Sequence, residues 1–149
     1  MSDQAPAHGG PDALGVPLHD FSTNANACGP CPVALAALRQ ADHRHYPDPA
    51  YTALRALLAG FHGVAPGRIV IAASASEFIH RITAHAARGG LRHAVLPAHG
   101  YGDYARAAHN WGLACGGMPA LAPALHWACE PASPLGTLDP SLATWAQAA

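Results

Sequence analysis

The chain has 149 residues, of which 50% are hydrophobic and 11% are charged, and its formal net charge is -1. This composition is typical of a globular domain or part of a larger one, and it excludes a disordered acidic or basic tail. No apolar run approaches the roughly 20 residues of a membrane-spanning helix, and no signal-peptide pattern is present, so we expect a cytoplasmic protein without a membrane partner. The eight basic residues are all arginines spread along the chain, which predicts no nucleic-acid partner.

The first expected elements are an extended arm and two helices. Prolines and glycines with few large apolar side chains predict an extended arm over residues 1–18. Apolar residues among alanines predict a short helix over 32–40. Asp48 is expected to cap a second helix with Pro49 at its first position, and glycines end this helix by Gly63.

A strand and a capped helix are expected next. The run 69–73 is short, apolar and rich in β-branched residues, which is the pattern of a strand buried on both faces. Ser74 and Glu77 have the S-x-x-E spacing of a capping box, so a helix should begin directly after the strand. Its inward side is expected to be formed by Phe78, Ile79, Ile82 and Ala86.

The remaining pattern alternates short strands with helices. Strands are expected at 93–97, 113–116 and 125–129, and helices at 101–111 and 139–149. Such alternation predicts an α/β fold with a mostly parallel sheet and helices on both faces of that sheet.

Cys28 and Cys31 form a C-G-P-C motif in front of the expected helix, as in thioredoxin-like oxidoreductases. A thiol at a helix N-terminus is stabilised as thiolate, and a second cysteine can resolve a mixed disulfide. However, that motif should follow a buried strand, whereas residues 22–27 are polar and typical of a turn. A thiol-disulfide oxidoreductase is therefore kept as an alternative.

The sequence predicts no metal site. Eleven histidines are present, but their spacing does not match known ligand patterns such as H-E-x-x-H. Cys115 and Cys129 lie too far from the first two cysteines for a zinc ribbon.

The joint between the strand at 69–73 and the following helix is the strongest candidate for a binding site. Backbone N–H groups at Ala75 and Ser76, the Ser76 hydroxyl and the helix dipole should all favour an anion there. Parallel α/β sheets bind ligands at their carboxyl edge, where this joint is expected. The joint therefore predicts a phosphate site.

Five segments in order resemble the N-terminal half of a fold-type I pyridoxal-phosphate-dependent enzyme of the class I/II aminotransferase group. They are similar to segments of histidinol-phosphate aminotransferases and threonine-phosphate decarboxylases, among them "D-x-S-x-N-x-N-P-x-G-P", "Y-P-D-P-x-Y-x-x-L-R" and "C-N-P-N-N-P-T-G". The matching segments are residues 20–30, 46–55, 71–79, 97–104 and 129–136. The resemblance covers about residues 20 to 137 and implies a partial pyridoxal-phosphate transferase fold.

The resemblance implies roles for residues that would bind pyridoxal 5'-phosphate. The positions of Ala75 and Ser76 hold the cofactor phosphate, and Tyr101 is expected to stack on the pyridine ring. Tyr46 is expected to reach the phosphate of the neighbouring subunit in a homodimer. Ser133 stands where the family has an asparagine that donates to the phenolic oxygen of the cofactor, so this chain has a shorter donor there.

The resemblance also implies the substrate and the domain division. Asn26 lies where the opening segment of the family faces substrate, which would be an amino acid or a phosphorylated amine. Residues 1–18 would be the arm, 19–63 the first segment of the small domain with the dimer contact, and 64–149 an incomplete large cofactor-binding domain. The segments do not separate transamination from decarboxylation.

The chain contains no lysine. The chemistry of pyridoxal phosphate needs a lysine amine for covalent attachment and proton transfer, and an arginine cannot replace it because its guanidinium stays protonated. We therefore expect a chain truncated before the catalytic lysine, and inactive alone. A non-catalytic α/β phosphate-binding module is the remaining alternative.

Overall fold

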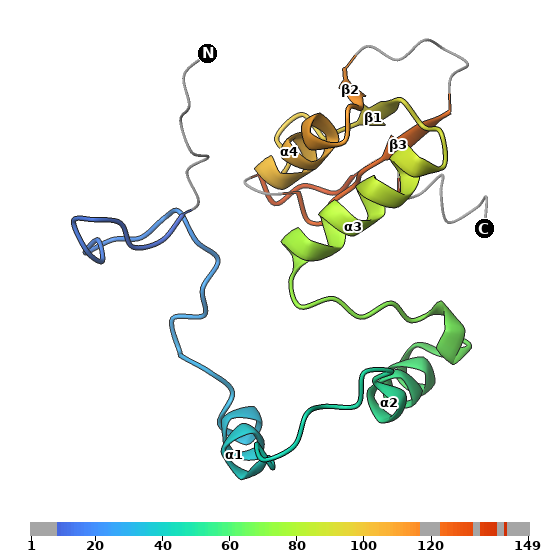
Figure 1. Ribbon diagram of the computed structural model, residues 1–149. Helices are drawn as coiled ribbons and strands as arrows, with labels where there is room; N and C mark the ends of the chain where they lie inside the picture. The colour runs from blue at the N-terminus through green and yellow to red at the C-terminus, as the bar shows by residue number, and fades with distance from the viewer. Residues whose placement is uncertain (1–8, 117–122, 133–134, 140–141, 143–149) are drawn as a thin grey trace. The chain divides into compact units, whose positions relative to one another are not determined.

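In the computed structural model the chain forms two compact units (Figure 1). The first unit spans Met1–Pro66 and the second spans Gly67–Ala149. The structure describes residues 9–116, 123–132, 135–139 and 142.

The first unit begins with irregular chain and continues into a helix. Residues 9–18 contain neither helix nor strand, and an isolated antiparallel bridge joins Asp12 to Gly15. Helix α1 spans Pro32–Gln40 and confirms the prediction for 32–40. Proline suits the first helical position, because the N–H group that it lacks would have no partner within the helix.

Helix α2 spans Thr52–His62, so it begins later than predicted. Asp48 does not act as its N-cap residue. Its carboxylate accepts from the N–H groups of Ala50 at 2.9 Å and Thr52 at 2.8 Å, which closes a turn in front of the helix. Tyr51 then adopts a left-handed conformation with φ 51° before the helix starts. The predicted end is confirmed, because Gly63 caps the helix with φ 64°.

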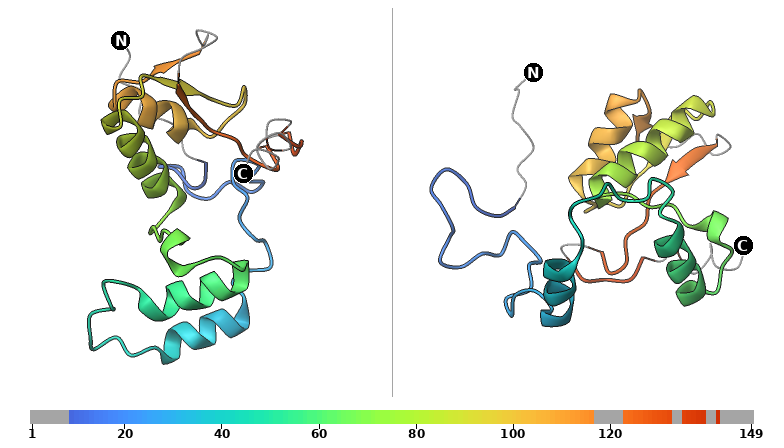
Figure 2. Two further views of the ribbon diagram at one scale, coloured as in Figure 1. Left: turned by 90° about the vertical axis from the view of Figure 1, so that its right-hand side faces the viewer. Right: turned by 60° about the horizontal axis from the view of Figure 1, so that its bottom comes forward.

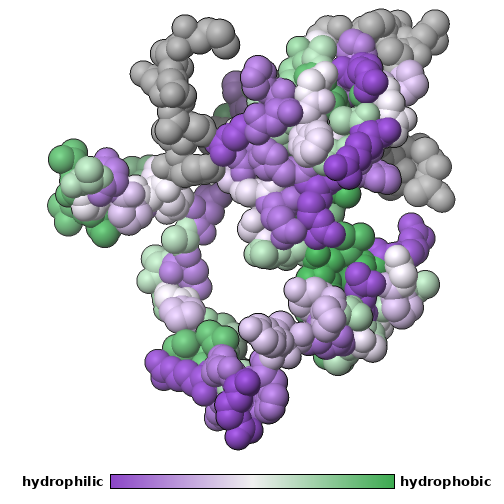
Figure 3. All heavy atoms as spheres, in the orientation of Figure 1, coloured by the Kyte–Doolittle hydropathy of each residue, from purple (hydrophilic) through white to green (hydrophobic). Residues whose placement is uncertain are grey.

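The first unit buries little apolar surface. Ala59 is its one buried hydrophobic residue among the described positions, and Phe61 is 83% exposed. Leu14 and Val16 are also exposed, and Figure 3 shows hydrophobic surface on this N-terminal loop, the dark blue segment of Figure 1. A unit with so many exposed apolar side chains has too small a core to be stable by burial alone.

The second unit opens with an extended segment and a capped helix. The short 3-10 helix η1 spans Pro66–Arg68. The predicted strand at 69–73, which follows it, is wrong, because these residues are extended but pair with no strand in the described chain. Helix α3 spans Ala75–Arg88, and Ser74 is its N-cap residue, as predicted.

Three short strands form an all-parallel sheet, which confirms the predicted α/β class. They are β1 (His93–Val95), β2 (Ala114–Cys115) and β3 (Ala124–His126), in the order β2-β1-β3. Each is shorter than the predicted strand at its position. Helix α4, Gly102–Asn110, connects β1 to β2 and confirms the prediction for 101–111. Asp139 and Leu142 are the described residues of the last predicted helix, and the rest of it lies outside the described chain.

The core of the second unit lies between the sheet and two helices, α3 and α4. One buried cluster joins Ile79, Tyr104 and Ala107 with Leu96 and Trp127. Another joins Ala94, Ala108 and Leu113 with Ala87, Leu96 and Leu125.

Alternate residues of a strand point to the same face, so Ala94 and Leu96 mark one face of β1. Both helices pack on that face, and Figure 2 shows them side by side there. Within the described part of the second unit, α3 and α4 thus cover this one face of the sheet.

Candidate functional site

Two side chains, those of Ser74 and Glu77, accept hydrogen bonds from backbone N–H groups at the N-terminus of α3. Ser74 Oγ accepts from the N–H of Glu77 at 3.1 Å, and Glu77 Oε2 accepts from the N–H of Ala73 at 2.5 Å. The Ser74 carbonyl accepts from Phe78 N–H at 3.1 Å. Within the described chain this leaves the N–H groups of the first two helical residues without an acceptor.

Those two residues are Ala75 and Ser76, the positions predicted to bind phosphate. Two unpaired N–H groups at a helix N-terminus carry the positive end of the helix dipole. Ser76 adds a hydroxyl that is only half-buried, so an anion can approach all three donors from solvent. The local geometry therefore suits a phosphate group.

The structure brings Tyr101 to the same place. Its hydroxyl lies 3.2 Å from Ser76 Oγ, although the two residues are 25 positions apart in the sequence. Tyr101 is the N-cap residue of α4 and is 41% exposed, so one part of its ring remains accessible. Two of the predicted cofactor residues thus share one hydrogen bond.

Tyr101 contacts a pair of stacked aromatic rings, Tyr104 and Trp127. Its ring meets Tyr104 edge-on, with centroids 6.2 Å apart, and Tyr104 stacks on Trp127 at 4.9 Å. Burial raises the pKa of Tyr104, and the neighbouring Cys129 adds to this effect. The role of Trp127 could not be predicted from the sequence, because this residue reaches Tyr104 only when β3, which directly precedes it, pairs with β1.

Arg81 fixes the extended segment that leads into α3. Its guanidinium donates to the Ile71 carbonyl at 2.9 Å and to Glu77 Oε1 at 3.2 Å. Glu77 also accepts from the N–H of Ala73, so the Arg81–Glu77 pair holds the extended segment at both Ile71 and Ala73. Sequence reasoning missed Arg81, although its spacing of four residues from Glu77 is that of a helical ion pair.

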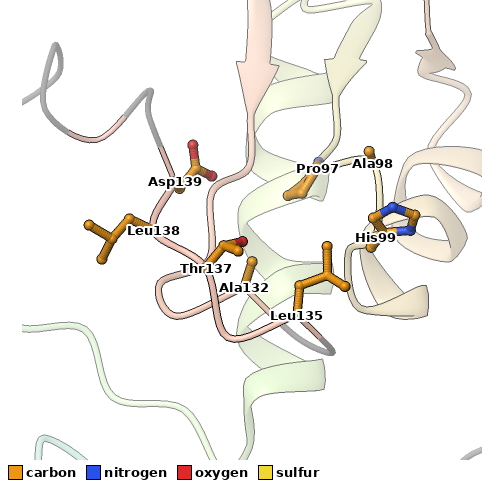
Figure 4. A pocket seen from close by; sticks show the side chains of 8 residues that line it. All are labelled: Pro97, Ala98, His99, Ala132, Leu135, Thr137, Leu138 and Asp139. Carbon is orange, nitrogen blue, oxygen red and sulfur yellow. The ribbon is translucent and has the colours of Figure 1, made fainter.

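A shallow pocket of about 260 Å³ lies at the carboxyl ends of β1 and β3 (Figure 4). The chain after β1 contributes Pro97, Ala98 and His99, and it leads directly to Tyr101. The chain after β3 contributes a turn in which Ala132 N–H donates to the Thr137 carbonyl at 2.8 Å. The pocket therefore occupies the edge where parallel sheets bind ligands. Its lining residues after β3 are Ala132, Leu135, Thr137, Leu138 and Asp139.

The other predicted site residues lie elsewhere in the chain. Tyr46 and Asn26 belong to the first unit, and Tyr46 is fully exposed. The Asn26 side chain accepts from the N–H of Cys28 and donates to the Gly29 carbonyl, both at 3.0 Å, so it forms a local turn. Ser133 lies outside the described residues.

The four cysteines are free, and two of them, Cys28 and Cys31, lie directly before α1. Cys31 is the N-cap residue, and hydrogen bonds from the N–H groups of Ala34 and Val33 lower the pKa of its thiol. No strand precedes the motif within residues 9–27, so the strand expected of a thioredoxin-like site is absent from that part of the chain. The described residues include no group of three or more potential metal ligands, and none of their helices is long and apolar enough to cross a membrane.

Comparison with known proteins gives matches to part of the chain. Over 88 residues it is 40% identical to the histidinol-phosphate aminotransferase of Roseiflexus castenholzii (strain DSM 13941 / HLO8), covering 53% of this chain and 24% of that protein. Over 119 residues it is 34% identical to the histidinol-phosphate aminotransferase of Erythrobacter litoralis (strain HTCC2594), covering 79% of this chain and 31% of that protein.

No protein-family profile and no solved structure matches the chain. The matched stretches span less than a third of the length of the two relatives. Within those stretches the chain is related to aminotransferases.

Proposed function

We propose that these residues form the cofactor-phosphate half of a pyridoxal-phosphate-dependent enzyme site of the class I/II aminotransferase group. The substrate type would be that of histidinol-phosphate aminotransferases or threonine-phosphate decarboxylases, namely an amino acid or a phosphorylated amine. In this proposal residues 1–18 are an arm, 19–63 belong to the small domain, and 64–149 belong to the large cofactor-binding domain of a cytoplasmic homodimer.

The observation that supports the proposal best is the contact between Ser76 and Tyr101. Their hydroxyl oxygens lie 3.2 Å apart beside the unpaired N–H groups of Ala75 and Ser76. A phosphate oxygen in this position can accept from both N–H groups and from the Ser76 hydroxyl, and the helix dipole favours its charge. These donors sit at the start of α3, where the sequence similarity to aminotransferases predicts the phosphate.

Other residues of the chain would hold the rest of the cofactor. Tyr101 presents a partly exposed ring that can stack on a flat aromatic ligand, and the row of Tyr104 and Trp127 below it fixes its position. Ser133 would donate to the phenolic oxygen and Tyr46 would reach the phosphate of the second subunit. Asn26 would face the substrate.

Pyridoxal phosphate supplies a ring that withdraws electrons from the carbon bearing the substrate amine. These 149 residues supply binding and orientation for that ring, but no residue among them is a lysine. They therefore fit the phosphate and the ring, and provide no side-chain amine for covalent attachment. We propose that they have no transaminase or decarboxylase turnover alone.

The test is a fluorescence titration of the purified chain with pyridoxal phosphate. Ser76→Asp places a carboxylate against the phosphate, and two unit charges about 4 Å apart repel by about 1 to 4 kcal/mol near a protein surface. This predicts a Kd that rises by about fivefold or more. The matched control is Ala53→Asp, which adds the same charge at the same position of helix α2 in the first unit, and it should leave the Kd unchanged.

Borohydride treatment of the bound mixture should fix pyridoxal phosphate to no side chain. Equal affinity of the wild type and the Ser76 variant would refute the phosphate assignment, and would leave Ser76 as an ordinary residue of a capped helix. Turnover of histidinol phosphate by a preparation free of host enzyme would refute the proposed inactivity.

A further inference from the structure

The hydroxyl group of Tyr101 has no task in the proposed function, in which this residue contributes only its ring. The hydroxyl oxygen nevertheless lies 3.2 Å from Ser76 Oγ, at the start of α3. Tyr101 directly precedes α4, and the two residues are 25 positions apart. The fold of the second unit therefore creates this contact, and the local sequence does not.

The Tyr101 hydroxyl is held in place by the packing of two helices. The Tyr101 carbonyl accepts from the N–H of Tyr104 at 3.1 Å, and the ring of Tyr101 meets that of Tyr104 edge-on. Tyr104 is buried in one cluster with Ile79, which lies on α3 three positions after Ser76. Because this cluster fixes the starts of α3 and α4 relative to each other, it also fixes the distance between the two hydroxyl groups.

The chemistry of the two hydroxyl groups favours one direction of the hydrogen bond. Each has one hydrogen, so only one of the two donates to the other. A phenol is the stronger acid and hence the better donor. When Tyr101 donates to Ser76 Oγ, the hydrogen of Ser76 is left for an anion at the helix N-terminus. Such a chain also strengthens the second hydrogen bond, because each bond polarises the next.

We propose, on the basis of the function proposed above, that Tyr101 is a positioning residue for the cofactor phosphate. Its hydroxyl donates to Ser76 Oγ and directs the hydrogen of Ser76 toward a phosphate oxygen. The face of the Tyr101 ring and its hydroxyl then serve different parts of the ligand. A phenylalanine would keep the stacking surface and lose the preference for a ligand that carries a phosphate.

The experiment titrates the full chain with pyridoxal phosphate and, separately, with pyridoxal, which has no phosphate, and follows fluorescence. In Tyr101→Phe the Kd for pyridoxal phosphate should rise about two- to tenfold, the effect of losing one hydrogen bond. The Kd for pyridoxal should stay unchanged. The matched control is Tyr51→Phe, which removes the same hydroxyl from a 42% exposed tyrosine directly before α2 and should change neither Kd.

Variants of Ser76 test whether Tyr101 acts through this residue. In the Ser76→Ala background, Tyr101→Phe should raise the Kd for pyridoxal phosphate no further, because the acceptor is gone. In the Ser76→Thr background, which keeps a hydroxyl, it should raise the Kd as much as in the wild type. An equal rise in all three backgrounds would overturn the proposal, since Tyr101 would then bind the ligand without Ser76. An equal rise for pyridoxal would also overturn it, because the substitution would then act on the ring.

The outcomes for Tyr101 and Ser76 separate this proposal from the proposed function. If Ser76→Asp weakens the binding of pyridoxal phosphate and Tyr101→Phe does not, the phosphate site stands and the role of the Tyr101 hydroxyl is refuted. If Ser76→Asp has no effect, the phosphate site fails and the role of Tyr101 fails with it. The Tyr101 side chain is 41% exposed and phenylalanine keeps its ring, so Tyr101→Phe leaves no cavity in the core.

Discussion

Ser74 and Ser76 lie two residues apart at the start of α3 but have different tasks, so substituting each with alanine separates stability from binding. Ser74 Oγ accepts from Glu77 N–H at 3.1 Å, and this is the side-chain cap of the helix. Removing such an N-cap typically costs about 1 kcal/mol, since one backbone donor then loses its partner. The second unit has the size of a small domain, for which this loss lowers Tm by about 4–8 °C.

Ser76→Ala removes no cap, and alanine is the better helix former. The gain in helix propensity offsets the loss of the exposed hydrogen bond to Tyr101, so we expect the Tm of Ser76→Ala to stay close to that of the wild type. Its affinity for pyridoxal phosphate should fall through loss of the hydroxyl donor. Thermal unfolding followed by far-UV circular dichroism measures the first effect, and a fluorescence titration measures the second. An unchanged Tm for Ser74→Ala, or an equal drop for both variants, would refute the assignment of the two serines.

Two further predictions concern the core and one surface carboxylate. Ile79→Ala removes a buried side chain packed between α3, α4 and the sheet, so the free energy of unfolding of the second unit should fall by about 2–5 kcal/mol in a urea titration. A loss below about 1 kcal/mol, which is closer to the effect of a surface substitution, would contradict this packing. Hydrogen bonds from the Arg44 side chain lower the pKa of Asp42 from 3.8 to about 2, so this interaction is complete above pH 3.8 and is lost as the pH falls through about 2. NMR titration of Arg44→Ala should show a higher pKa for Asp42, and an unchanged pKa would refute the pairing.

Local signals in the sequence predicted the helices well. Proline at the first position of α1 and the Ser74–Glu77 spacing at α3 both act within one helical turn, so they can be recognised without knowledge of tertiary structure. The predicted start of α2 was wrong for an equally local reason. The Asp48 carboxylate accepts from N–H groups of a turn in front of the helix, and an aspartate is equally suited to a turn and to a helix cap.

Features that depend on distant partners were harder to predict. The apolar run at 69–73 has the composition of a buried strand, but a strand also needs a neighbour with which to hydrogen-bond, and composition does not supply one. The site shows the same division. The donors at Ala75 and Ser76 follow from the capping pattern, whereas the support of Tyr101 by Trp127 exists only once β3 joins the sheet.

The most direct test of the phosphate site observes the backbone N–H groups of Ala75 and Ser76 by two-dimensional NMR of the nitrogen-15-labelled chain. Pyridoxal phosphate and inorganic phosphate should both shift these two amide signals more than any others, and pyridoxal without its phosphate should not. The same titration of Ser76→Asp should leave them in place. Binding of pyridoxal phosphate that shifts other amides while Ala75 and Ser76 stay unchanged would contradict the account.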